Sequence, residues 1–178
     1  RGISICRFGV IFHLFTRRGQ RMELDASQLY ADKTTVEFGR ELTSAQKKSL
    51  LQAALAYANS LGIDGLEASL EKTSAGGLFT WSANKALVLT CPLGDFEFHG
   101  VLTMQPVKDT CVLGVYKLLH GESLFAVNQS AEVRRRVVID QLRDIEVVDY
   151  FFLIDKATDW VAEFLHTSVK EILGATKS

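Results

Sequence analysis

The stretch FEFHGVLTMQPVKDTCVLGVYKLL, residues 96–119, decides the fold. Pro106 divides it into two apolar runs, Phe96–Met104 and Cys111–Leu119. Proline cannot donate a ladder hydrogen bond, so we expect a hairpin that turns near Val107 and Lys108. This register pairs Met104 with Cys111, Leu102 with Leu113 and Phe96 with Leu119, all on one face. Lys117, which then lies opposite Phe98, fits that face poorly.

Further strands are expected upstream of this hairpin. Across Val36–Leu42 apolar and polar residues alternate, as in a strand with one face in water. Leu66–Leu70 alternates in the same way after the turn signal Asp64-Gly65. The pair Gly76-Gly77 then introduces Leu78–Ala83 and Ala86–Cys91, on either side of Asn84-Lys85. We predict that the last three segments form successive antiparallel strands.

One long helix is expected between the first and second of these strands. Thr43 followed by Gln46 has the spacing of a capping box, and Gly62 suits the left-handed end of a helix. The residues between them that share one helical stripe are apolar: Leu50, Leu51, Ala54, Leu55, Ala58 and Leu61.

Helical periodicity returns after Asn128 or Ser130 and ends before Gly174. Within it, Val147–Ile154 is rich in β-branched and aromatic residues, which fits either a buried strand or the middle of one long helix. A continuous helix from Ser130 to Leu173 would far exceed the mean length of about 11–12 residues. We therefore expect a break near Asp144 or Asp155, followed by a terminal amphipathic helix.

These elements predict an α+β fold, a mainly antiparallel, curved sheet of about five to seven strands packed against the helix after Thr43 and the C-terminal helices. Residues 22–178 are expected to form a single domain, because no repeat, low-complexity tract or Pro/Ser-rich linker divides them. The layout is loosely similar to helix-grip lipid-binding domains and to cone-shaped α+β folds that hold small ligands between sheet and helix. That similarity covers roughly residues 34–174, concerns architecture alone and implies no function by itself.

Residues 1–21 form a basic leader with five arginines and no acidic residue. Two interpretations stay open. Upstream or vector DNA encodes the leader and Met22 is the natural start, or the leader supplies a genuine first strand with Val10, Phe12 and Leu14 on one face. A third interpretation is a basic arm that contacts an acidic partner.

Charge, cysteine content and hydropathy restrict the class of protein. The chain has 20 basic and 21 acidic residues, so removing the five arginines of the leader leaves 15 basic residues and a formal charge of −6. Such an acidic body repels phosphate backbones, and we expect no nucleic-acid partner. Cys6, Cys91 and Cys111 do not fit a paired disulfide framework, which favours reduced thiols and a cytoplasmic location. The longest uncharged apolar stretch has eight residues, 8–15, where a bilayer span needs about 20, so no membrane partner is expected.

The strongest candidate for chemistry lies on the polar side of the hairpin. Glu97 and His99 are two residues apart and so share one face, and the predicted register places Tyr116 across from His99. A carboxylate beside an imidazole can orient it as a general base. The competing interpretation of Glu97, His99 and Tyr116 is a solvated face of the sheet.

No other motif carries chemistry. Phosphate loops, a nucleophile elbow and short-spaced zinc ligands are missing from the sequence, so neither a metal nor a cofactor is expected, and Cys91 and Cys111 are interpreted as buried structural thiols. His120 and His166 are expected at the surface. Arg134–Arg136 fan around a helix, which favours internal ion pairs with Asp140 and Asp144 over phosphate binding.

The aromatic residues suggest a recognition surface. Phe79, Trp81, Phe98, Trp160 and Phe164 are either core or the lining of a pocket or interface between the sheet and the terminal helix. The leading hypothesis is a non-catalytic binding or interaction protein, expected to be a homodimer, whose partner is an apolar small molecule or another protein. The alternative is a small acid–base enzyme, a hydrolase or isomerase, that uses Glu97, His99 and Tyr116.

Overall fold

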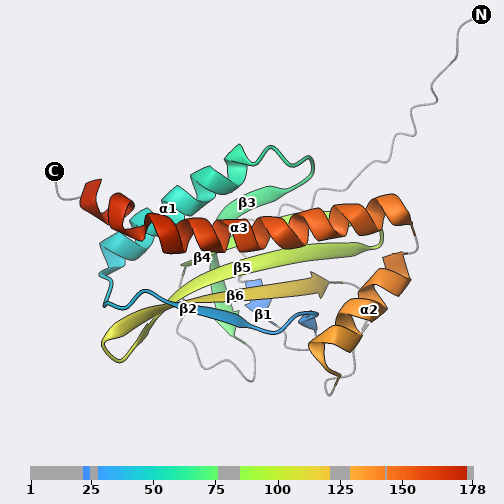
Figure 1. The fold of residues 1–178 in the computed structure, drawn as a ribbon, viewed down its shortest axis with the longest axis horizontal. Coiled ribbons are helices and arrows are strands. Elements are labelled where there is room, and N and C mark those ends of the chain that lie inside the picture. The colour runs from blue at the N-terminus through green and yellow to red at the C-terminus, as the bar shows by residue number, and fades with distance from the viewer. Residues whose placement is uncertain (1–21, 25–27, 76–84, 121–128, 143, 176–178) are drawn as a thin grey trace, which may run out of the picture.

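The computed structural model describes residues 22–24, 28–75, 85–120, 129–142 and 144–175. Figure 1 shows a twisted sheet with α1 and α3 lying across it. The elements are β1 (Met22–Leu24), β2 (Thr34–Glu37), α1 (Ser44–Ser60), β3 (Glu67–Ala75), β4 (Lys85–Leu93), β5 (Phe96–Val107), β6 (Thr110–His120), α2 (Ala131–Leu142) and α3 (Ile145–Ala175). The expected α+β class, an antiparallel sheet with helices, is confirmed. In the described part of the chain, no helix is long and apolar enough to cross a bilayer.

The strands form one sheet in the order β1-β3-β4-β5-β6-β2. Neighbours from β3 through β6 are antiparallel, β2 joins β6 antiparallel, and β1 joins β3 in parallel. Strand β2 is at one edge of the sheet and β3 is next to the other edge, so α1, which connects them, carries the chain across the sheet. The expected strand over 78–83 lies outside the described residues.

The hairpin of β5 and β6 forms with a register two residues from the predicted one. Val107 pairs with Thr110, and a two-residue loop of Lys108 and Asp109, with φ of Lys108 at 51°, connects them. Met104 therefore faces Leu113, and Phe98 faces Leu119. Because the shift is an even number of residues, every side chain keeps its predicted face.

The predicted register was wrong because Pro106 lies inside β5 and does not end the strand. It pairs with Cys111, whose N–H donates to the carbonyl of Arg40 and whose carbonyl accepts from Phe38 N, each at 2.9 Å. Both polar groups of Cys111 thus bond on the side away from β5. The missing N–H of Pro106 therefore leaves Cys111 satisfied, and the strand continues.

The observed register also explains Lys117. It lies opposite Gly100, which has no side chain, whereas the predicted register placed it opposite Phe98. Above this point α3 supplies Asp155 and Asp159, whose carboxylates lie 3.1 and 2.8 Å from Lys117 Nζ. A lysine on an apolar face is thereby neutralised.

Helix α1 begins and ends as its sequence predicts. Gln46 N donates to Thr43 Oγ1 at 3.2 Å and Thr43 N donates to Gln46 Oε1 at 2.9 Å, which completes the capping box. Gly62, just past the last turn, has φ of 63°. The strand expected over 36–42 is shorter, since β2 ends at Glu37 and Gly39 takes a positive φ of 65°.

The C-terminal third is helical with a break where one was expected. Asp144 lies between α2 and α3, and its Oδ1 accepts a hydrogen bond from Glu146 N at 2.9 Å. Val147–Ile154 lies within α3, so the strand interpretation is wrong. Its apolar residues divide by helical period, with Phe151 and Ile154 buried and Phe152 and Leu153 exposed.

The main core lies between the sheet and the two long helices. One cluster joins the buried face of α1 to α3 and to strands β4, β5 and β6. Its fully buried members include Leu50, Leu87, Leu89, Leu102, Leu113, Val161 and Leu165. A second cluster around Phe98 and Phe151 continues the layer toward α2. This packing fixes the separation of α1 from the sheet.

Candidate functional site

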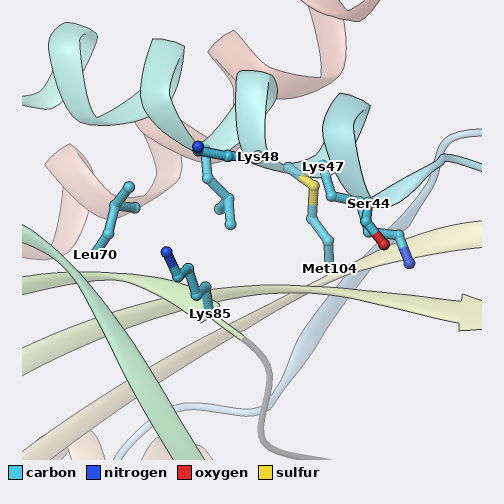
Figure 2. Close-up of a pocket in the computed structure, with 7 residues that line it drawn as sticks. Ser44, Lys47, Lys48, Leu70, Lys85 and Met104 are labelled. Carbon is cyan, nitrogen blue, oxygen red and sulfur yellow. The ribbon is translucent and has the colours of Figure 1, made fainter.

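A pocket of about 280 Å³ opens between the N-terminal half of α1 and the sheet. It is lined by Ser44, Lys47, Lys48, Leu51, Leu70, Lys85 and Met104. Figure 2 shows Lys48 and Lys85 with their side chains in the space between helix and strands. We call this cavity the α1 pocket. It is a candidate binding site formed by residues from four different elements.

The α1 pocket follows from the periods of its elements. Ser44, Lys47, Lys48 and Leu51 stand at steps of three, four and seven on one helical stripe. Below them, Leu70 of β3 pairs with Leu87 of β4, and Lys85 shares the face of Leu87 because it is two residues away. The lining therefore combines polar side chains, Ser44, Lys47, Lys48 and Lys85, with the apolar side chains of Leu51, Leu70 and Met104.

The electrostatics of the α1 pocket are one-sided. Lys47 lies in the first turn of α1 and Lys48 directly follows, where the helix dipole is positive and no acidic residue offsets it. None of Lys47, Lys48 and Lys85 forms an ion pair with an acidic side chain of the described residues. The pocket thus combines cationic groups with an apolar floor.

Cys111 belongs to the core beneath the same region. Burial raises the pKa of its thiol, and the positive charge of Lys47 lowers it in part. Burial likewise raises the pKa of Cys91, whose Sγ donates to Tyr150 Oη at 3.3 Å. Both thiols are free and buried, which supports their interpretation as structural.

The predicted acid–base residues are only partly brought together. His99 Nε2 lies 3.4 Å from Glu97 Oε2, while neither ring nitrogen of His99 makes a hydrogen bond within the described structure. Tyr116 pairs with Val101 and not with His99, because of the two-residue shift. Burial raises the pKa of Tyr116.

His120 was missed as a neighbour of this group. It pairs with Glu97 across the hairpin, and its ring centroid lies 4.2 Å from that of His99. The expected surface position of His120 is wrong, since the residue is half-buried, whereas His166 is exposed. In the described ranges, no three His, Cys, Asp or Glu side chains are arranged to hold a metal ion.

The three predicted aromatic residues that the structure describes, Phe98, Trp160 and Phe164, do not share one surface. Phe98 is fully buried in the core, and its ring centroid lies 6.2 Å from that of Tyr30. Phe164 stacks on Tyr57 of α1 with centroids 4.4 Å apart and ring planes at 2°. Trp160 is exposed on α3. Phe79 and Trp81 lie outside the described residues.

A buried ionic cluster links the sheet to α2 and α3. Asp155, 3 % exposed, accepts a hydrogen bond from Tyr30 Oη at 2.8 Å and lies 3.3 Å from Arg135 Nη2, in addition to its contact with Lys117. Arg134 pairs with Asp32 at 3.6 Å. The prediction of internal ion pairs is therefore correct for Arg134 and Arg135, but their predicted partners, Asp140 and Asp144, are wrong.

The residues that line the α1 pocket gave little sign of a binding site in the sequence. Lysine at the start of a helix and leucine in a strand are common, and the pocket arises only when α1 crosses the sheet. The available signal was two consecutive lysines at a helix start without an acid. No protein-family model, curated protein or solved structure matches the chain.

Proposed function

We propose that this protein is a non-catalytic binding protein whose small-molecule ligand occupies the α1 pocket. The observation that carries the proposal is the volume of about 280 Å³, close to the lower end of the roughly 300–1,000 Å³ that is usual for ligand pockets. Its mixed lining supports the same function, because a few polar groups around an apolar floor can orient a ligand. In this proposal the site lies under α1, and not beside the terminal helix, where the aromatic residues had led us to expect it.

The packing around the pocket supports a preformed site. Leu51 and Met104 are core residues, and Leu70 packs against the same cluster, so the floor is held by the contacts that hold the fold. A ligand would meet this floor without reordering it. Preformed sites lose less conformational entropy on binding.

Binding can be tested with two probes of the same length, neutral octanol and anionic octanoate. At the roughly 30 Å³ that a water molecule occupies in the liquid, the pocket has room for about nine or ten heavy atoms, the size of these probes. We expect saturable NMR shifts of the methyl groups of Leu51, Leu70 and Met104 with at least one of the two.

The variant Ser44→Trp introduces a large side chain at an exposed lining position and should abolish these shifts. Asn59→Trp, exposed in the last turn of the same helix and not part of the lining, is the matched control and should retain them. Unshifted methyl groups with both probes, or equal shifts in both variants, would contradict the proposal.

The alternative function is an acid–base enzyme, favoured by the Glu97–His99 contact at 3.4 Å. In this alternative His99 is the base, Glu97 orients it, and Tyr116 acts from the diagonal position on the same face. Hydrolysis of p-nitrophenyl acetate should then fall at least tenfold in His99→Gln and not in His166→Gln. Equal rates for the two variants would rule the alternative out.

A further inference from the structure

We infer that the ligand of the α1 pocket is an amphiphile with one anionic headgroup and a short aliphatic tail. The inference rests on the proposed function and names the chemistry of its ligand. The headgroup lies between Lys48 and Lys85, whose side chains end in the same part of the gap between helix and strands (Figure 2), and the tail lies along Leu51 and Met104. The combination of lysines and apolar side chains in one lining carries the inference.

The lysines of the α1 pocket have no carboxylate to balance them among the described residues. Lys48 lies near the positive end of the α1 dipole and Lys85 adds a like charge from β4, whereas Lys47 ends on the other side of Met104 (Figure 2). Elsewhere the same protein neutralises Lys117 with two carboxylates. An anionic headgroup would supply the counter-charge that Lys48 and Lys85 lack.

The floor excludes a fully polar anion such as free phosphate as the best ligand. Leu51 and Met104 are nearly fully buried, and a polar ligand reaching them would lose hydration without gaining hydrogen bonds. An aliphatic tail instead gains roughly 0.8 kcal/mol for each buried methylene. Lysines act as point charges that accept either a carboxylate or a phosphate ester, so the headgroup class is an anion and not one specific acid.

Calorimetry or NMR titration should separate the contribution of the headgroup charge to the affinity from that of the aliphatic tail. Octanoate is expected to bind roughly tenfold or more tightly than octanol, and moderate salt should weaken octanoate alone. Each of Lys48→Gln and Lys85→Gln should weaken octanoate binding about two- to fivefold and leave octanol binding unchanged, as expected for partly exposed charge pairs. Lys170→Gln, exposed on α3, is the matched control and should change neither. Octyl phosphate binding more tightly than octanoate would identify a phosphate headgroup within the same class.

The ligand-free protein provides an independent measurement. Removing a cation near the positive end of α1 should raise the urea midpoint of Lys48→Gln while lowering its affinity for octanoate. A merely structural role would lower stability and leave affinity unchanged. Equal affinity for octanol and octanoate, or lysine variants that bind octanoate normally, would overturn the anionic headgroup and leave the proposed function standing. Absence of binding by all three probes would overturn both.

Discussion

At the scale of single residues, Asp155 shows how context changes the meaning of a side chain. In the sequence it is one acid in a helical stretch and a suggested break point. In the structure it lies inside α3 and bonds to Tyr30, Lys117 and Arg135 from three other segments. A buried carboxylate with three such partners fixes α3 relative to α2 and β6.

Neutralising this carboxylate should destabilise the protein. We expect Asp155→Asn to lower the free energy of unfolding by about 3 kcal/mol, because Arg135 loses its partner and Lys117 retains only Asp159. Asp149→Asn, an exposed acid on the same helix, should change it by less than about 0.5 kcal/mol. Urea denaturation compares the two, and coincident curves would contradict the role given to Asp155.

Three tyrosines predict a loss of stability in alkali. Burial is the largest cause that raises the pKa of Tyr30, Tyr116 and Tyr150 above the ordinary value of 10.0. The folded state therefore holds these protons more tightly than the unfolded state, and the stability they contribute is complete below pH 10 and is lost as the pH rises above it.

Tyr30, which is fully buried, should cost about 1.4 kcal/mol per pH unit in this range. We expect the urea midpoint to fall steeply above about pH 10, with a shallower fall in Tyr30→Phe. Phenolate absorbance should appear together with unfolding. A midpoint that stays flat while the tyrosines ionise would contradict this prediction.

From single residues, only part of the candidate acid–base group and little of the α1 pocket could be predicted. Glu97 and His99 were correctly placed together because a period of two fixes the face of a strand. Tyr116 was misplaced because its neighbour depends on loop length, which Pro106 obscured. Leu70, Lys85 and Met104 had no signal of their own, since their meeting requires three strands and a crossing helix.

At the scale of elements, the contact between α3 and the sheet depends on Gly100. A Cβ at this position would lie 2.4 Å from Thr158 Oγ1 and 3.0 Å from Thr158 Cγ2. Thr158 is fully buried and its hydroxyl donates to the carbonyl of Ile154 at 3.3 Å. The helix therefore approaches the sheet closely at a position where β5 has no side chain.

This close approach predicts a strong coupling between two positions. Gly100→Ala should cost about 1–3 kcal/mol through overpacking, and Thr158→Ala should remove most of that penalty by vacating the space. A double-mutant cycle should give a coupling energy above about 1 kcal/mol. Strictly additive effects would show that α3 does not contact Gly100 as described.

Helices and strands were more predictable than their register. The capping box located α1 to the residue, and alternation located parts of β3 and β4, because both signals are local. The length of β5 was underestimated because the hydrogen bonds that make Pro106 acceptable belong to Arg40 and Phe38, far away in the chain. The helical state of 147–154 likewise depends on the layer that buries Phe151 and Ile154.

At the scale of the whole molecule, the expected homodimer stays a prediction. Helix α3 exposes Phe152 and Leu153 and, about two turns later, Trp160, the last at 39 %. Large apolar side chains clustered on a surface are typical of protein interfaces. We expect light scattering to give about twice the chain mass of 19.8 kDa and Trp160→Glu to reduce it. A monomer mass for the parent protein would contradict the dimer.

The edge of the sheet at β3 has a consequence for behaviour in concentrated solution. Beside β3, β1 covers only Thr73–Ala75, so in the described chain the backbone of Glu67–Lys72 has β4 on one side alone. Such an open margin can recruit a strand from another molecule and start aggregation. This part of β3 carries Glu67, Glu71 and Lys72, and the cost of burying their charges opposes the addition of a further strand. The most apolar strands, β4, β5 and β6, lie inside the sheet.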